Sequence, residues 1–402
     1  MKKRILFVIP YMHGGGAQRA LSNIQAFLAD TYEIDTLLNS EIGRVYPSRG
    51  RVITLGLDQT PKTGSVIFQF RAFIRRIRKL RRLKKSGRYT ACISLIDSAN
   101  IANILSGRKH CKCVISIRTS LSSNIGLPQY KYIVNPLARL LYRRADTVVA
   151  VSEELGRELT AAFHLEDSRI SVIQNGFDLK TIRSRSEEQI ERTIADRIGE
   201  NRVILTAGRL DGAKHQWHLI RAFSGICSAR QDAVLVIAGD GELMPYLKAL
   251  AKRLKISERV IFPGFTENVY QYMRRADVFV LPSGFEGFPN ALGEALCVGT
   301  PCIATDFRTG AREILAPELL FNGKEIDQVT ECTYGILTPV CSGTMYKGNE
   351  PLEPQEKELA GAMARLLGDE QLRDRYREKS MERSSTLDIQ SVVKKWIEVI
   401  EA

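Results

Sequence analysis

The stretch RILFVIPYMHGGGAQR at residues 4–19 decides the fold class, because an apolar run of strand length ends in three glycines and passes straight into a helical pattern. The apolar and β-branched residues of 4–10 fit a buried strand, and 17–29 fits an amphipathic helix. A strand that feeds a helix through a short loop is typical of a parallel α/β sheet. Ligands bind beyond the carboxyl ends of such strands, so 13–19 is a candidate ligand loop.

The same alternation of strands and helices continues along the chain. In the first half, strands are predicted at 4–10, 32–38, 52–55, 91–95, 114–118, 147–151 and 170–173, with helices at 17–29, 66–85, 137–144 and 152–162. The pattern breaks near Asn175, where a polar helix is predicted over 186–198. It then returns, with strands at 203–207, 233–238, 260–262, 278–281, 301–304 and 335–337 and helices at 216–227, 243–254, 269–275, 289–297, 355–367, 369–383 and 388–401. We therefore expect two doubly wound α/β domains, with a long loop over 338–354.

The composition favours a globular protein of more than one domain: 402 residues, 44% hydrophobic and 26% charged. Its apolar runs fall short of the roughly 18–20 residues that a membrane-spanning helix needs. The apolar stretch near the N-terminus is too short for a signal peptide. We therefore expect neither a secreted nor an integral membrane protein. The eight cysteines have neither a disulfide framework nor zinc-type spacing, so buried, reduced thiols in a cytoplasm are expected.

The positive charge is concentrated in the first half of the chain. Residues 1–180 hold 29 Lys and Arg against 13 Asp and Glu, whereas residues 181–402 hold 29 against 32. Such a distribution favours an anionic partner for the first half. The segment Arg71–Arg88 contains ten Lys and Arg and no acid. Its apolar residues form a helical stripe of Phe70, Phe73, Ile74, Ile77, Leu80 and Leu83. The segment is predicted to contact an anionic membrane surface; the alternative is that the stripe docks on the protein's own sheet.

Two cations follow the predicted strand at 203–207. Arg209 comes directly after Gly208, and Lys214 lies on the same strand-to-helix loop. A guanidinium offers two parallel hydrogen bonds and an ammonium a mobile point charge, and the pair suits a diphosphate.

A second motif, Glu286 to Glu294 (EGFPNALGE), spans a predicted helix start. Proline fits the first helical position, so the helix is expected to begin at Pro289. The N–H groups of Asn290, Ala291 and Leu292 would then be available to a phosphate. Glu286 precedes the helix, and Glu294 lies more than one turn inside it, roughly 7 Å along the axis from the helix start. The alternative interpretation is a pair of solvated glutamates at an ordinary helix start.

Together with Asn175-Gly176-Phe177-Asp178, Gly239-Asp240-Gly241-Glu242 and Gly264-Phe265, these motifs make the chain resemble the family-4 retaining, nucleotide-sugar-dependent glycosyltransferases. The resemblance is clearest from about 170 to 310. It implies the GT-B architecture, in which two Rossmann-like domains face each other across a cleft. Residues 1–180, joined by a returning C-terminal helix over 386–402, would form the acceptor-side domain. Residues 181–385 would form the donor domain.

The resemblance also implies roles for individual residues. Arg209 and Lys214 would hold the donor diphosphate, Glu286 would face the transferred sugar, and Glu294 would bind the ribose. The remaining donor contacts would be the backbone cradle of Asn290, Ala291 and Leu292, Phe265 and Thr266 near the base, and Gly15 and Gly16 at the phosphate. The chain departs from the family at His215, where a small or amide-bearing residue is usual, and at Arg118, where a His is common. Asp97, Asn100 and Arg118 are the acceptor-side candidates.

The expected function is transfer of a sugar, with retention, from a UDP-linked donor to a polyprenyl-linked or polysaccharide acceptor. Neither a metal nor another cofactor is expected, and nucleic acid is not an expected partner. The expected location is the cytoplasmic face of the plasma membrane. Two alternatives remain at this point: a nucleotide-sugar epimerase or phosphorylase of the same fold, and a non-enzymatic polyanion-binding protein.

Overall fold

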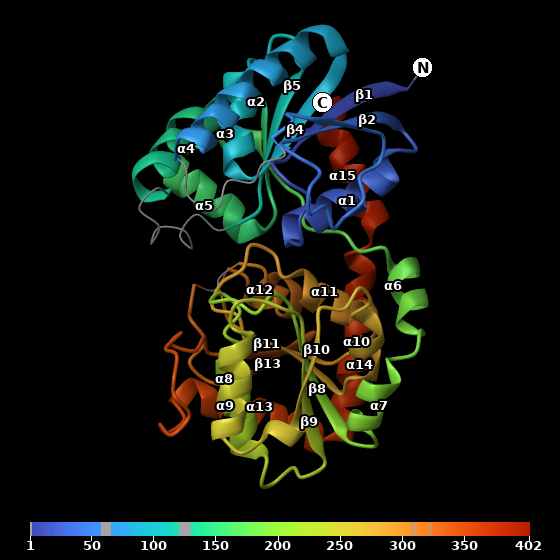
Figure 1. Ribbon diagram of the computed structural model, residues 1–402, viewed down its shortest axis with the longest axis vertical. Helices are drawn as coiled ribbons and strands as arrows, with labels where there is room; N and C mark the ends of the chain where they lie inside the picture. Colours follow the sequence, from blue (N-terminus) through green and yellow to red (C-terminus); the bar gives the residue numbers. More distant parts are fainter. Residues whose placement is uncertain (1, 58–65, 120–129, 308, 322) are drawn as a thin grey trace. The chain divides into compact units, whose positions relative to one another are not determined.

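The computed structural model describes residues 2–57, 66–119, 130–307, 309–321 and 323–402. The chain divides into two compact units, Met1–Gly176 with Ile389–Ala402 and Phe177–Asp388. The sequence had placed these divisions at 180 and 385. Each unit contains a seven-stranded sheet flanked by helices (Figure 1).

The sheet of the first unit is parallel, with the order β3-β2-β1-β4-β5-β6-β7. Its strands are β1 (Lys3–Val8), β2 (Tyr32–Leu38), β3 (Arg51–Thr54), β4 (Tyr89–Leu95), β5 (Lys112–Ile117), β6 (Thr147–Ala150) and β7 (Ile170–Val172). Its helices are α1 (Gly16–Leu28), α2 (Val66–Gly87), α3 (Asp97–Leu105), α4 (Asn135–Leu141), α5 (Glu153–Phe163) and α15 (Ile389–Glu401), and a π-helical segment, Tyr130–Val134, precedes α4.

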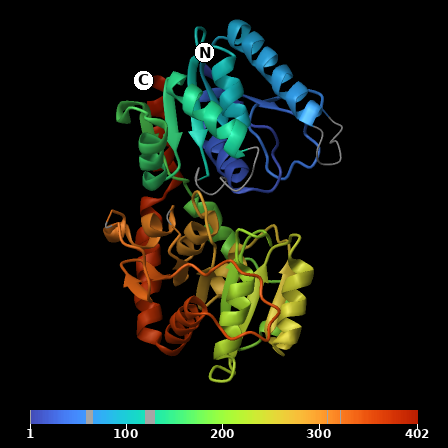
Figure 2. The ribbon, with the colours of Figure 1, turned by 90° about the vertical axis from the view of Figure 1, so that its left-hand side faces the viewer.

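The two faces of this sheet are covered by different helices, as Figures 1 and 2 show. On one face α1 and the returning helix α15 share a core with β1, β2 and β4, in which Trp396 is fully buried. On the other face α2 and α3 close a second core around Leu80 and Ala99. The C-terminal helix therefore belongs to the first unit.

The sheet of the second unit has the order β10-β9-β8-β11-β12-β14-β13 and is parallel except for β13. Its strands are β8 (Arg202–Ala207), β9 (Ala233–Ala238), β10 (Val260–Gly264), β11 (Val278–Leu281), β12 (Cys302–Thr305), β13 (Thr330–Cys332) and β14 (Gly335–Thr338). Its helices are α6 (Leu179–Ser186), α7 (Arg192–Ile198), α8 (Gln216–Ile226), α9 (Met244–Arg253), α10 (Tyr270–Arg275), α11 (Asn290–Cys297), α12 (Ala311–Leu315), α13 (Pro354–Gly368) and α14 (Glu370–Thr386). Helices α8, α9 and α13 share one core, and α11 packs against β11 and β12.

The prediction of one polar helix over 186–198 was wrong. A separate helix, α6, begins at Leu179, where the Asp178 carboxylate caps it by accepting from the Thr181 N–H, and it ends at Ser186. The chain then turns before α7 begins at Arg192. Among the α-helices and strands, four short ones were missed altogether, namely α3, α6, α12 and β13. Each is at most nine residues long, too short for a clear periodic pattern.

All eight cysteines are free thiols, and all but the half-buried Cys227 are buried, as expected from their apolar neighbours. Among the described residues, no helix combines the length and the apolar character needed to cross a bilayer.

Helix α2 docks its apolar stripe on the first unit's own sheet. Leu80 is fully buried there, whereas Phe70, at the N-terminal end of the stripe, is exposed. Two of the ten cations are buried with the stripe. Arg76 donates to Asn39 Oδ1 at 2.8 Å and to Ser98 Oγ at 3.2 Å. Lys84 Nζ donates to two main-chain carbonyls of the α3 region. Part of the basic segment therefore stabilises the fold of the first unit, which its composition did not reveal.

We expect Arg76→Ala to lower the free energy of unfolding by about 2–3 kcal/mol, because it takes the Arg76 donor away from the buried Asn39 Oδ1 and removes buried contacts. Arg78→Ala, on the exposed side of the same helix, serves as the control and should change stability by no more than about 0.5 kcal/mol. Urea unfolding followed by circular dichroism measures both. Equal effects of the two substitutions would contradict the structural role of Arg76.

Candidate functional site

The loops that follow β8, β9 and β10 are joined by main-chain hydrogen bonds at the carboxyl edge of the second sheet. Gly208 N–H donates to the Ala238 carbonyl at 3.0 Å, and Gly239 N–H donates to the Gly264 carbonyl at 2.8 Å. Leu210 N–H in turn donates to the Asp240 carbonyl at 3.0 Å. These bonds hold the Arg209 loop rigidly at the edge where α/β sheets bind ligands.

Two glycines of the 239–242 motif are required by this close approach. A Cβ at Gly239, where φ is +144°, would lie 1.9 Å from the Gly208 carbonyl oxygen. A Cβ at Gly241 would lie 2.4 Å from the Leu210 carbonyl oxygen. Both obstacles are backbone atoms, so neither can move aside. The motif thus packs main chain against main chain, which explains its two glycines physically.

Lys214 and Glu286 form an ion pair that joins the loop after β8 to the loop after β11. Their side chains are 19% and 14% exposed, so the pair is largely withdrawn from water. Ser283 Oγ donates to the same Glu286 oxygen at 2.9 Å. The Glu286 carbonyl also accepts from the hydroxyl of Thr309. These contacts fix the positions of one cation and one carboxylate that the sequence had singled out separately.

Arg209 behaves differently from Lys214. Its side chain is 69% exposed, and its Nε lies 3.2 Å from Asp211 Oδ2. Its carbonyl is held by the Gln216 side-chain amide at 2.8 Å. The backbone of Arg209 is therefore anchored while its guanidinium reaches into solvent. Such a side chain can reorient towards an anion at little cost.

Helix α11 differs in two details from the prediction. It begins at Asn290, and Pro289 is its N-cap instead of its first residue. The N–H of Leu292 donates to the Pro289 carbonyl at 3.1 Å, so it is committed within the helix and was wrongly expected to be available. Gly293 is needed because a Cβ there would lie 2.3 Å from the Phe177 ring. Asn290 and Ala291 stand at the helix start, as expected, and both are half-buried.

The other donor-side candidates lie near these loops in the chain and differ in exposure. Glu294 is buried inside α11. Phe265, just past the end of β10, is 64% exposed, which leaves its ring available for stacking. Thr266 Oγ1 donates to the Asn268 carbonyl at 3.2 Å.

His215, the departure that the sequence analysis noted, has a left-handed backbone with φ +52° and ψ +29°. Glycine and asparagine adopt this conformation most readily, which is a physical reason for a small or amide-bearing residue at this position. Burial lowers the pKa of His215 to about 4. The ring is therefore neutral at physiological pH and adds no third positive charge to the loop.

The glycine loop of the first unit is open rather than strained. Gly15 is the N-cap of α1 in an extended conformation, and Gly16 is the first residue of the helix. A Cβ at Gly14 would meet no atom within 4 Å. A Cβ at Gly15 would lie 2.5 Å from Gln18 Oε1, the end of a flexible side chain, so backbone geometry does not require glycine at 14 or 15.

Two of the three acceptor-side candidates are buried in the first unit. The Asn100 amide donates to the Ser116 carbonyl at 3.0 Å. Arg118 donates to Asn175 Oδ1, and its guanidinium lies 5.9 Å from the centre of the Trp396 ring. Burial lowers the pKa of Arg118 to about 10, so it remains charged. Asp97 is less buried and accepts from the Tyr142 hydroxyl at 2.6 Å.

Sequence reasoning missed the side chains that support Glu286. Besides Ser283 and Thr309, the hydroxyl of Thr305 donates to the Ser283 carbonyl at 2.6 Å. The only signal in the sequence is a serine three residues before Glu286, which by itself is too common to indicate a function.

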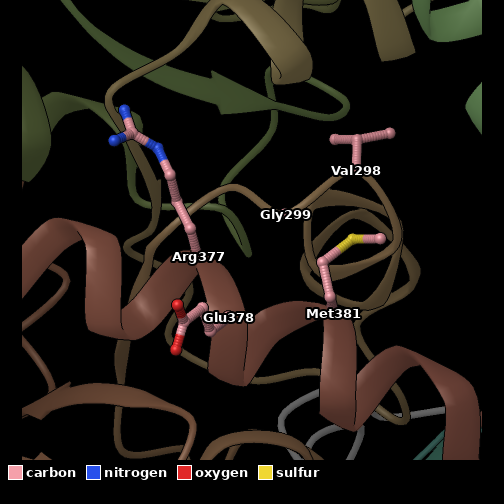
Figure 3. Close-up of a pocket in the computed structure, with 5 residues that line it drawn as sticks. All are labelled: Val298, Gly299, Arg377, Glu378 and Met381. Carbon is pink, nitrogen blue, oxygen red and sulfur yellow. The ribbon is translucent and has the colours of Figure 1, made fainter.

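A hollow of about 520 Å³ lies between the end of α11 and helix α14 (Figure 3). It is lined by Val298, Gly299, Arg377, Glu378 and Met381. The Arg377 guanidinium is paired with Asp374 at 2.6 Å. None of the candidate site residues lines this hollow, so it is separate from the site.

Comparisons with known proteins agree with the motifs. The family model for Glycosyltransferase Family 4 matches residues 14–181, and that for Glycosyl transferases group 1 matches residues 187–331. An uncharacterised glycosyltransferase of Methanocaldococcus jannaschii is 30% identical over 314 residues, which are 77% of each chain. An N-acetylgalactosamine-N,N'-diacetylbacillosaminyl-diphospho-undecaprenol 4-alpha-N-acetylgalactosaminyltransferase of Campylobacter jejuni is 31% identical over 63% of this chain and 59% of its own length.

The fold is also that of solved glycosyltransferase structures. HepE of Anabaena, determined in complex with UDP and glucose, superimposes with a TM-score of 0.75 over 100% of both chains at 18% identity. The predicted GT-B fold is thereby confirmed.

Proposed function

The chain belongs to glycosyltransferase family 4, and from that premise we propose that it transfers a sugar, with retention, from a UDP-linked donor to a lipid-linked or polysaccharide glycan and releases UDP. The observation that carries the donor assignment is the pairing of Lys214 with Glu286 beside the Arg209 loop. A fixed ammonium and a mobile guanidinium on one loop suit the two phosphates of a nucleoside diphosphate. UDP is favoured as the nucleotide because HepE binds it.

In this proposal the leaving diphosphate gains negative charge as the glycosidic bond breaks. Arg209, Lys214 and the start of α11 would stabilise that charge more strongly in the transition state than in the ground state. These groups would do so without a metal ion. A diphosphate would compete with Glu286 for the Lys214 ammonium, which would turn the Glu286 carboxylate towards the sugar.

The remaining residues would complete the donor site. Phe265 would stack on the base beside Thr266, and Glu294 would accept from the ribose hydroxyls. Asn290 and Ala291 would offer their N–H groups to a phosphate, and Gly15 and Gly16 at the start of α1 would approach the phosphate and the acceptor. On the acceptor side we propose Asp97, Asn100 and Arg118, of which Asn100 and Arg118 are buried in the first unit.

A lipid-linked acceptor would bring the enzyme to the cytoplasmic face of a membrane. The name of the Campylobacter relative specifies a diphospho-undecaprenol acceptor.

In this chain, seven of the ten cations between Arg71 and Arg88 are exposed. Helix α3 contacts both α2 and α4, so the three helices lie side by side (Figure 1). Exposed apolar side chains near them are Phe70, Tyr132, Ile133, Leu137 and Leu140. Exposed basic groups on α2 together with exposed apolar groups on these neighbouring segments favour an anionic bilayer as the partner.

We expect Lys214→Ala and Arg209→Ala each to lower turnover at least tenfold, a loss of about 1.4 kcal/mol of transition-state stabilisation. The measurement is release of UDP at saturating donor. Lys252→Ala, an exposed lysine on α9, is the control and should retain the parent rate. Full activity of either site variant would show that its cation does not hold the diphosphate.

The expected product from an α-linked UDP-sugar is an α-glycoside. Both glutamates of the motif lie in or beside α11 in the donor-side unit, and the departing diphosphate oxygen can itself take the acceptor proton on the same face. Because Glu286 is proposed to face the transferred sugar, Glu286→Gln should slow transfer more than it weakens UDP binding. The coupling constant of the new anomeric proton decides the stereochemistry, and a β-linked product would overturn the retaining mechanism.

Binding to vesicles rich in phosphatidylglycerol should be sensitive to salt, because charges are screened over about 8 Å at physiological ionic strength. Replacing the exposed residues Arg71, Arg75, Arg78 and Arg82 with Gln should abolish co-sedimentation at moderate salt. Arg76 is kept because it is buried. Vesicles of phosphatidylcholine alone are the control. Unchanged co-sedimentation of the variant would exclude α2 as the contact.

A further inference from the structure

We propose that His215 is a positioning residue of the donor site. Its ring fills the space between three loops of the second unit and so sets Lys214 against Glu286. The loops are 208–215 after β8, 282–289 after β11 and 339–353 after β14. The inference rests on the proposed function for its catalytic consequence, but the packing that it describes can be tested without any activity.

Two glycines face the His215 ring from the other two loops. A Cβ added at Gly284 would lie 2.4 Å from Cε1 and 2.7 Å from Nε2 of the ring. A Cβ added at Gly343 would lie 3.3 Å from each of the same two atoms. The ring therefore occupies the volume that a side chain at either position would need. Gly284 does not have a positive φ, so its main obstacle to a methyl group is His215 itself.

Neighbouring residues of α8 fix the third loop beside this ring. The Trp217 and His218 rings lie 4.9 and 5.5 Å from the His215 ring, centre to centre. Trp217 Nε1 donates to the Thr344 carbonyl at 2.9 Å, and His218 Nε2 accepts from the Gly343 N–H at 3.1 Å. The loop that carries Gly343 is thus held in place by hydrogen bonds on both sides of the contact.

A main-chain hydrogen bond links the first two loops next to the ion pair. The N–H of Gly284 donates to the Ala213 carbonyl at 3.0 Å. Ala213 precedes Lys214, and Gly284 stands two residues before Glu286. The hydrogen bond at Ala213 precedes Lys214 in the chain, and the ring contact at His215 follows it. Together they fix the distance between the two loops that the Lys214 ammonium spans to reach Glu286.

The side chain of His215 acts by its volume and not by a hydrogen bond. Its Nδ1 is buried and has no hydrogen-bond partner within the described part of the chain. Its left-handed backbone would be adopted more readily by glycine. Replacing the ring by glycine should therefore relax the backbone and remove the contact together, so the test needs a control that makes the backbone change alone.

The test uses His215→Gly, Gly284→Ala and the double variant. We expect His215→Gly to lower kcat about tenfold and to change KM for the donor much less, because Lys214 is misplaced for the transition state. Gly284→Ala should lower kcat at least as much, and also the melting temperature, because its methyl group overlaps the ring. In the double variant the methyl group has room, so kcat should return to at least the His215→Gly value and the melting temperature should recover.

The matched control is His164→Gly. His164 ends α5 in the first unit with the same left-handed backbone, φ +51°, so this variant makes the same chemical change away from the site. It should leave kcat unchanged. The inference is overturned if Gly284→Ala behaves like the parent, or if the two substitutions have additive effects. If the parent releases no UDP from any nucleotide sugar, the proposed function fails, while recovery of the melting temperature in the double variant still decides the packing.

Discussion

The ion pair of Lys214 and Glu286 is the interaction on which the proposed donor site depends. Withdrawing two charges from water is unfavourable, and their attraction offsets it only with good geometry and further hydrogen bonds. Ser283 supplies such a bond to the carboxylate, and Thr309 holds the Glu286 main chain. The loops after β8 and β11 are therefore held in one register by electrostatics. Because Glu286 holds the Lys214 ammonium in place, a diphosphate would find it already oriented. A diphosphate carries more charge than one carboxylate, so it would be able to displace Glu286.

Close backbone approach is the second constraint, and it explains why the motifs contain glycine. At the carboxyl edge, Gly239 and Gly241 place their main chain where any Cβ would overlap a carbonyl oxygen of the Arg209 loop. Gly293 is needed for another reason, since the Phe177 ring covers it inside α11. The glycines at 14 and 15 are under neither constraint. Glycine-rich motifs that look alike in the sequence thus meet different physical requirements, and only the structure separates them.

The order of strands, glycine loops and helices could be predicted from the sequence because hydrophobic period and turn residues are local properties. Pairings between distant residues could not. Lys214 and Glu286 stand 72 positions apart, so the sequence offered them as two independent candidates. Likewise, the N–H of Leu292 is satisfied by Pro289 because the first turn of α11 is tight, and helix periodicity does not reveal this. Helix α6 was missed because its start depends on one side-chain cap, at Asp178.

The excess positive charge of the first unit consists of buried cations that belong to the fold and exposed cations that do not. Residues 59–145 contain 19 Lys and Arg and a single acid, Asp97. Arg76 and Lys84 are satisfied by buried oxygen atoms, so their charges belong to the fold. The exposed cations of α2 have few acidic neighbours in the chain, and their mutual repulsion opposes the compact state. An anionic surface would remove that repulsion when it binds. An acceptor tethered to a bilayer through a diphosphate would supply such a surface and the substrate in the same place, so in the proposed function one electrostatic property serves both docking and acceptor capture.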